Sequence, residues 1–130
     1  MKKTFFNLQF FATLTLSLFS AMSAFASSLV IEVPDTPEPT IESIAYQCSI
    51  GTKKERVEAT YYNTGDISLV DLKWNEKRII AANVISASGA KYAGGEYIWW
   101  TKHNEASLYD LINDPKEEKP FHCVEEQDKK

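Results

Sequence analysis

The chain has few residues that bind metal ions. It contains 2 cysteines and 2 histidines in 130 residues. Cys48 and Cys123 lie far apart, and neither is clustered with His103 or His122. A zinc site in a protein needs about four such ligands brought together by closely spaced pairs. We therefore expect no metal site and no cofactor.

The chain also lacks an apolar run long enough to span a membrane as a helix, which takes about 20 residues. Its longest apolar stretch, Phe10–Ala21, follows Lys2 and Lys3 and precedes Ala24-Phe25-Ala26. This order of charge, apolar run and small residues is typical of a secretory signal peptide. We interpret residues 1–26 as that signal. No cysteine directly follows it, so we expect no lipid anchor on the mature chain.

The chain has fewer basic than acidic residues. The chain has 14 Lys and Arg against 18 Asp and Glu, a net charge of −4. Loss of the two lysines of the signal peptide would make the remainder more acidic still. Such a balance is poorly suited to nucleic acid or to anionic lipid, and it favours a basic partner. We expect no nucleic-acid partner.

The two cysteines predict a disulfide, because an even number of cysteines in an exported chain is normally paired. A bridge between Cys48 and Cys123 would close a long loop, which corresponds to a stabilisation of about 4 kcal/mol. Two buried free thiols are the alternative. An oxidising compartment makes that alternative the weaker one.

No segment has helical periodicity, whereas short stretches of alternating apolar and polar residues recur between turn sequences. This pattern is typical of a small antiparallel barrel or sandwich. We expect a Pro-rich lead at 27–40, a barrel at 41–124 and a frayed tail at 125–130. The expected strands cover Ile44–Cys48, Arg56–Tyr62, Ile67–Trp74, Arg78–Ile85, a hairpin centred on Gly94-Gly95, and Ala106–Ile112.

The hairpin contains the most distinctive residues of the chain. A two-residue loop at Gly94-Gly95 would place Ser88 opposite Thr101, and a three-residue loop would place it opposite Lys102. Both registers bring Ser88 close to Lys102 at the open end of the hairpin, and the sequence does not choose between them. The adjacent Trp99 and Trp100 must point to opposite faces of the strand, so we expect one of them in the core.

The motif Ser88-Gly89-x-x-Tyr92, followed by Trp99-Trp100-x-Lys102 and Glu105-Ala106, resembles the bacterial inhibitors of c-type lysozyme, in their membrane-bound and periplasmic forms. The resemblance is dense from Ser86 to Leu108. It implies an all-β fold, an antiparallel eight-stranded barrel with one disulfide. It also implies a protein that is not an enzyme, has c-type lysozyme as its partner and lies in the periplasm of a Gram-negative bacterium.

The resemblance also assigns roles to single residues. Lys102 matches the residue that enters the lysozyme cleft, and Ser88 matches one that contacts the active site. Gly89 and Tyr92 belong to the same motif and are further candidate contacts. His103 stands where the family usually has glycine, so the loop after Lys102 is expected to be reshaped, and His103 is a candidate contact too.

Other interpretations of these residues remain. Ser88 could be an ordinary loop serine, and Lys102 an ordinary solvated charge at a strand end. A Ser–Lys hydrolase is the enzymatic alternative, but it needs a buried lysine and an oxyanion hole. A small barrel that binds an apolar ligand is another, although aromatic side chains leave little room inside. The sequence leaves open whether the protein forms a homodimer.

Overall fold

The computed structural model describes residues 26–127, and the chain divides into two compact units, residues 1–32 and residues 33–130. The described part of the first unit has no regular secondary structure, and its Leu29, Val30 and Ile31 are exposed. The expected signal peptide, residues 1–26, lies outside the described residues except for Ala26. All strands among the described residues belong to the second unit.

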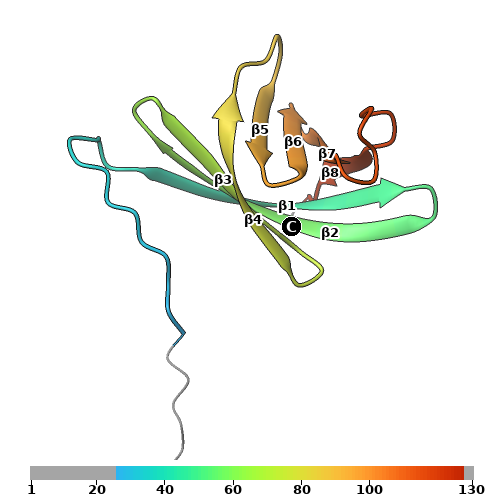
Figure 1. The fold of residues 1–130 in the computed structure, drawn as a ribbon, viewed down its shortest axis with the longest axis horizontal. Coiled ribbons are helices and arrows are strands. Elements are labelled where there is room, and N and C mark those ends of the chain that lie inside the picture. Colours follow the sequence, from blue (N-terminus) through green and yellow to red (C-terminus); the bar gives the residue numbers. More distant parts are fainter. Residues whose placement is uncertain (1–25, 128–130) are drawn as a thin grey trace, which may run out of the picture. The chain divides into compact units, whose positions relative to one another are not determined.

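The second unit is a closed antiparallel barrel in which each strand pairs with the next, and the last with the first (Figure 1). This confirms the all-β fold, the eight-stranded antiparallel barrel with one disulfide. No helix in the described residues is both long and apolar enough to cross a bilayer. The strands are β1 (Thr40–Ile50), β2 (Lys53–Thr64), β3 (Ile67–Trp74), β4 (Lys77–Val84), β5 (Ala90–Gly94), β6 (Tyr97–Lys102), β7 (Glu105–Asp110) and β8 (Phe121–Glu125).

Alternate side chains of these strands fill the barrel, because successive residues of a strand point to opposite faces. The ring of Tyr46 meets the edge of Trp99 at 5.0 Å between centroids, and Trp74 meets Tyr97 in the same way at 5.0 Å. Trp99 is fully buried whereas its neighbour Trp100 is half-buried. This confirms the expectation that one of the two tryptophans belongs to the core.

The disulfide joins the first strand to the last. Cys48 and Cys123 are directly opposite each other in the β1–β8 pairing, and both are buried. β1 and β8 pair only from Tyr46 to Ser49 on the β1 side, so this is a short junction. The disulfide therefore links β1 to β8 covalently at the junction where few backbone hydrogen bonds join them.

The ordered barrel is longer than the sequence indicated. β1 begins at Thr40, and β8 was not expected as a strand at all. β8 runs to Glu125, and the next residue, Glu126, donates its backbone N–H to Ala45 O at 2.8 Å and pairs with Arg56 at 2.8 Å. The first two residues of the expected frayed tail are thus part of the barrel.

The order of the strands places three connections at one end of the barrel: the β2–β3 turn, the β4–β5 loop and the β6–β7 turn. The start of β1 and the end of β8 lie at the same end, since each strand runs opposite to its neighbours. The β4–β5 loop (residues 85–89) and the β6–β7 turn (His103-Asn104) flank the β5–β6 hairpin there. We call this pair of segments, with Lys102, the site rim.

The register of the β5–β6 hairpin differs from both expected registers. Tyr92 pairs with Trp99 and Gly94 with Tyr97, so the two-residue loop is Gly95-Glu96. Ser88 lies outside the ladder, because β5 begins only at Ala90, and it is directly opposite neither Thr101 nor Lys102. Gly94 belongs to the strand because it lies against β4: a Cβ at this position would be 2.4 Å from Ile80 O. This close approach moves the turn by one residue.

Candidate functional site

The β4–β5 loop brings Ser88 to the rim although no strand pairing supports it. Ser88 is exposed, and its carbonyl oxygen accepts a hydrogen bond from Trp100 Nε1 at 2.8 Å. Gly89 has φ +65°, and a Cβ there would be 2.1 Å from Thr101 O. Only glycine fits such a backbone approach in this conformation. The loop is therefore folded onto β6, immediately before Lys102.

Lys102 is the last residue of β6 and its side chain is exposed. It pairs with Glu105 across the two-residue turn, and Glu105 pairs in turn with Val124 of β8. A further hydrogen bond, from Glu125 N to Asn104 O at 2.9 Å, ties the turn to β8. Among residues 26–127, Lys102 makes no ion pair. The lysine thus has a firmly held backbone and an ammonium that is available to a partner.

His103 takes up the backbone conformation that favours glycine. Its φ is +57°, in the left-handed region, whereas Asn104 beside it is not among the described residues with positive φ. A side chain with a Cβ is strained there by roughly 1 kcal/mol or more. The residue after Lys102 thus has a backbone conformation that glycine adopts without strain, although the chain has histidine there.

Tyr92 occupies the inside of the barrel, where it is 5% exposed. Its hydroxyl lies 3.2 Å from Ser68 Oγ on β3, and its ring is 5.8 Å from that of Tyr61. The side chain supports the hairpin from within. Direct contact with a partner would require it to leave the core.

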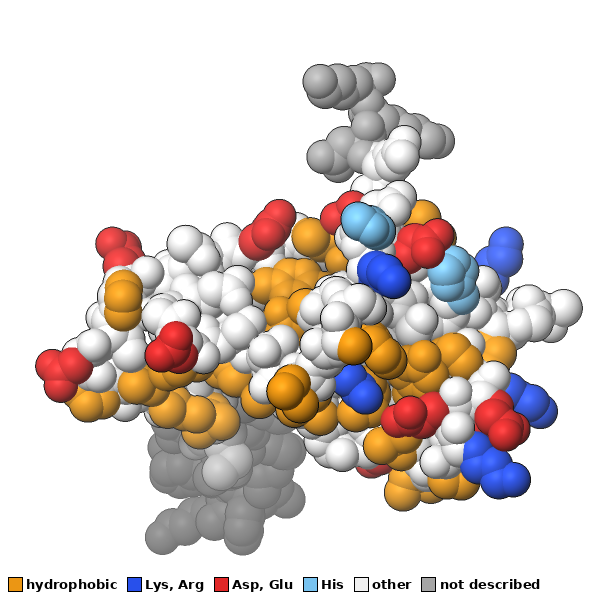
Figure 2. All heavy atoms as spheres, turned by 90° about the horizontal axis from the view of Figure 1, so that it is seen from above, with side chains coloured by type: hydrophobic (Ala, Val, Ile, Leu, Met, Phe, Trp, Pro, Cys, Tyr) orange, Lys and Arg blue, Asp and Glu red, His pale blue; other side chains and the backbone are white. Residues whose placement is uncertain are grey.

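The rim has charges of both signs. His122 Nε2 on β8 lies 3.8 Å from Glu105 Oε1, next to the Lys102 pair. Figure 2 looks at the barrel from the side on which the β4–β5 loop projects in Figure 1, and shows both histidines gathered with lysine and acidic side chains. Within residues 26–127 no group of three His, Cys, Asp or Glu side chains is placed to hold a metal ion. The cluster is an ionic surface.

Ser88 and Lys102 lie on the exposed surface of the rim and line neither of the two surface hollows described below. One surface hollow, of about 590 Å³, is lined by the β1–β2 and β7–β8 ends of the barrel, including Lys53, Lys116 and Phe121. Another, of about 290 Å³, lies over β1 and β2. Neither is lined by Ser88 or Lys102. An exposed serine and lysine without a shelter are poorly placed for nucleophilic catalysis, but well placed to enter a cleft on another molecule.

Hydrogen-bonded aromatic side chains fill the interior, which leaves little space for an apolar ligand. Trp99 Nε1 donates to Tyr61 Oη at 2.9 Å, and the Tyr61 and Tyr46 hydroxyls lie 3.1 Å apart. Burial raises the pKa of both tyrosines, and for Tyr61 the hydrogen bond with Tyr46 raises the pKa further. These three side chains cross the barrel from β1 and β2 to β6.

Sequence reasoning missed the roles of two residues, one in the rim and one beside it. Ile85 was expected at the end of a strand, but it starts the β4–β5 loop and is 98% exposed. For Trp100 only its side of the strand was considered, whereas its indole N–H donates to the Ser88 carbonyl. An apolar residue directly before a Ser- and Gly-rich loop was the available signal for Ile85. The role of the indole depended on the loop conformation and had no signal in the sequence.

Residues 46–117, more than half of the chain, match the family described as membrane-bound lysozyme-inhibitor of c-type lysozyme. The chain belongs to this family. Two relatives are each named membrane-bound lysozyme inhibitor of C-type lysozyme. The one from Pseudomonas aeruginosa is 42% identical over 80 residues, and the one from Cupriavidus necator is 38% identical over 74 residues. Both names are those of inhibitors and not of enzymes.

The matches cover 61% and 57% of this chain and the same shares of the two relatives, so the chain spans less than two thirds of their length. A crystal structure of Pseudomonas aeruginosa MliC in complex with hen egg white lysozyme is similar over a larger part. It has a TM-score of 0.63 and 35% sequence identity, and the similarity covers 78% of this chain and 98% of that one. The barrel is therefore the fold of this inhibitor family.

Proposed function

We propose that the protein inhibits c-type lysozyme by inserting the Lys102 ammonium, with the Ser88 hydroxyl beside it, into the acidic catalytic cleft. The observation that carries the proposal is the site rim: an exposed lysine without an ion pair among the described residues, on a turn tied to β8. The family, and the lysozyme bound to the similar Pseudomonas aeruginosa MliC, support the choice of partner.

The chemistry of lysozyme explains why one lysine suffices. Retaining glycosidases hold two carboxyl groups about 5–5.5 Å apart, one protonated as the general acid and one ionised. An ammonium between them favours ionisation of both, so the acid loses the proton that it must donate. The side chain also occupies the space of the substrate. Lys102 therefore blocks both binding and catalysis.

The other rim residues have graded roles in this proposal. Ser88 Oγ donates a hydrogen bond to a carboxylate of the cleft, and Gly89 lets the enzyme approach the loop closely. His103 lies at the edge of the contact. Tyr92 is a supporting residue, because it is buried in the barrel.

We place the protein in the periplasm, where it would protect the peptidoglycan of its producer from host lysozyme. The relatives are named membrane-bound, which fits a protein that works in the cell envelope. The acidic chain, with a net charge of −4, attracts a basic enzyme over a distance. Added salt should therefore slow association, because the Debye length falls to about 8 Å at physiological ionic strength.

The deciding experiment replaces Lys102 by alanine and measures the inhibition constant in a peptidoglycan-clearing assay with c-type, g-type and i-type lysozymes. We expect Lys102→Ala to weaken inhibition of the c-type enzyme by about 2–4 kcal/mol, as when one member of a desolvated charge pair is removed. Lys54→Ala, an exposed lysine at the other end of the barrel, is the matched control. An unchanged inhibition constant for Lys102→Ala would refute insertion.

A further inference from the structure

The β4–β5 loop has no strand partner, so other contacts must hold it. The β4–β5 ladder ends at the pair of Val84 with Lys91, and β5 begins at Ala90. Four of the five residues from 85 to 89, Ser88 among them, are exposed. An exposed loop of small residues without a ladder has many accessible conformations, and each ordered residue costs about 1–2 kcal/mol of backbone entropy.

Three contacts replace the missing ladder, and two of them involve β6. Trp100 Nε1 donates to Ser88 O at 2.8 Å, and the backbone of Gly89 lies directly against Thr101 O. Within the loop, Ser86 Oγ donates to Gly89 O at 3.3 Å. The Trp100 contact is the only one of these made by a side chain from outside the loop.

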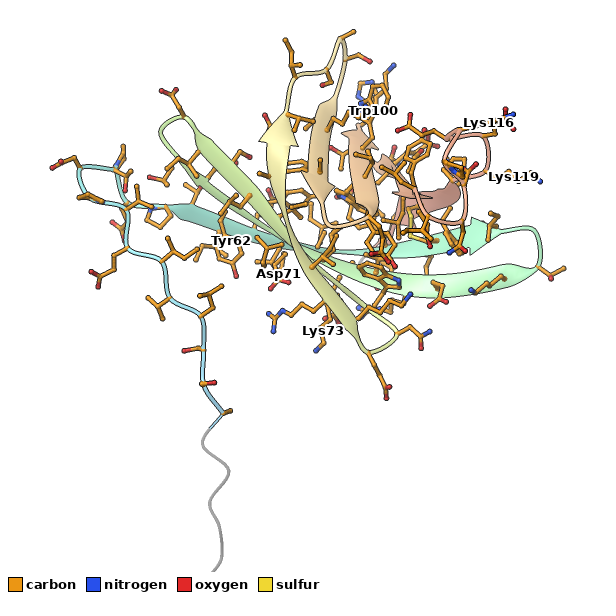
Figure 3. The ribbon with its side chains drawn as sticks, in the orientation of Figure 1. Tyr62, Asp71, Lys73, Trp100, Lys116 and Lys119 are labelled. Carbon is orange, nitrogen blue, oxygen red and sulfur yellow. A yellow bond between two sulfur atoms is a disulfide. The ribbon has the colours of Figure 1, made fainter. Side chains whose placement is uncertain are left out.

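The Trp100 ring has a second contact, with β5. Lys91 Nζ lies 4.9 Å from the centroid of the Trp100 ring, and Lys91 and Trp100 are directly paired between β5 and β6. A cation over an indole face at this distance is attracted by about 0.5–1 kcal/mol at an exposed site. Figure 3 shows Trp100 at the end of the hairpin, beside the loop. The indole thus contacts both a cation on β5 and a carbonyl group of the loop.

We propose that Trp100 is a positioning residue that holds the β4–β5 loop against β6, so that the Ser88 hydroxyl is presented next to Lys102 before a partner arrives. The consequence for inhibition rests on the function proposed above, but the effect on the loop does not. Trp99 and Trp100 then have separate tasks. The first donates its N–H to Tyr61 inside the barrel, and the second donates to the loop outside it.

Holding the loop in advance affects affinity through the population of the competent state. If only a fraction of molecules has the loop in place, the apparent dissociation constant rises by the inverse of that fraction. One hydrogen bond contributes about 0.5–1.5 kcal/mol net. Its loss lowers the ratio of ordered to disordered loop by roughly two- to twelvefold, and inhibition weakens by up to that factor. The effect on global stability is smaller because the ring packing remains.

The test uses Trp100→Phe, which keeps a ring under Lys91 and removes the N–H donor. Amide hydrogen exchange and 15N relaxation of residues 85–89 are measured in the free protein, and inhibition is measured with c-type lysozyme. Insertion of 3-benzothienyl-alanine at position 100 is a closer variant, because it retains the bicyclic ring without the N–H. Ser43→Ala, which removes a 2.9 Å hydrogen bond with Thr60 elsewhere on the outer surface, is the matched control.

We expect both replacements at position 100 to speed exchange and increase motion in residues 85–89 only, and to weaken inhibition about fivefold. Ser43→Ala should change neither. Unchanged loop dynamics would overturn the proposal. So would a loosened loop with unaltered inhibition, provided that Lys102→Ala impairs inhibition in the same assay.

A second variant keeps the idea testable if Trp100→Phe does not fold. Gly89→Ala leaves the indole intact but forces the loop away from Thr101 O, so it should loosen the same residues and weaken inhibition at least as much. If Lys102→Ala had no effect on inhibition, the proposed function would fail, and the loop measurements alone would decide the role of Trp100.

Discussion

The two sides of the site rim are supported in different ways. Lys102 lies on a turn whose neighbours pair with β8, one residue from the row that contains the Cys48–Cys123 bridge. Ser88 lies on a loop that begins where the short β4–β5 ladder ends. The backbone of Lys102 is thus held close to the disulfide-linked β1–β8 junction. The Ser88 hydroxyl group depends on the β4–β5 junction, which has no covalent link. Loss of order at the site should begin on the Ser88 side.

The largest expected effect comes from breaking the covalent junction. The double variant Cys48→Ala/Cys123→Ala should lose about 4 kcal/mol of unfolding free energy, because the unfolded chain regains the entropy of a long open loop. Urea unfolding followed by circular dichroism measures this. A reducing agent should lower the stability of the natural protein and leave the variant unaffected. A loss below about 1 kcal/mol would show that β8 holds β1 without the bridge.

A smaller effect is expected from the β4–β5 junction. Gly94→Ala would place a Cβ 2.4 Å from Ile80 O and 2.8 Å from Ala81 Cα. Forcing these strands apart should cost about 1–3 kcal/mol, as overpacking generally does. Gly95→Ala, next along the chain, meets nothing within 4 Å and has only the strain of its φ of +56°. Thermal unfolding of the two variants compares them, and equal losses would contradict the close-approach argument.

The buried tyrosines of the interior predict a dependence of stability on alkaline pH. Burial raises the pKa of Tyr61 and Tyr46, so the folded protein keeps these hydroxyls protonated when the unfolded chain ionises them near pH 10. The contribution of these tyrosines to the free energy of unfolding is fully present below pH 10. Above pH 10 it falls by up to about 1.4 kcal/mol per pH unit for each tyrosine. Unfolding at pH 9 to 11.5 measures the slope, which Tyr61→Phe should reduce.

The smallest effect is expected at His103. Replacement by glycine removes the strain of φ +57° but adds freedom to the unfolded chain, so His103→Gly should raise stability by no more than about 1 kcal/mol. Affinity for lysozyme should change by no more than about tenfold, or 1.4 kcal/mol. Asn104→Gly, at a position without positive φ, should instead destabilise. A greater loss of inhibition in His103→Gly would identify the imidazole as a contact.

The sequence predicted much of the barrel because its strands alternate clearly between turn residues. The strand from Ile67 to Trp74 was predicted with its actual bounds. β8 was missed because its five residues follow a charged loop and are too few to show a pattern. The hairpin register was wrong because it depends on how closely Gly94 approaches β4, which is a tertiary contact.

The location of the candidate site in the fold was predictable to a similar degree. The motif singled out Ser88 and Lys102, and the structure places both on the same exposed rim. The support of the loop by Trp100 could not be predicted, because an indole N–H finds its acceptor only after the loop has folded. The exposure of Ile85 likewise follows from where the β4 ladder ends.

The even number of strands has a practical consequence for work with this protein. Both ends of the barrel chain, Thr40 and Glu125, emerge at the end that contains the rim. A purification tag or a fused fluorescent domain attached directly at Thr40 or Glu125 would crowd an incoming enzyme. The protein could instead be immobilised through a lysine of the β7–β8 connection, such as Lys116 or Lys119 (Figure 3). This connection lies at the other end of the barrel, so the rim would stay free.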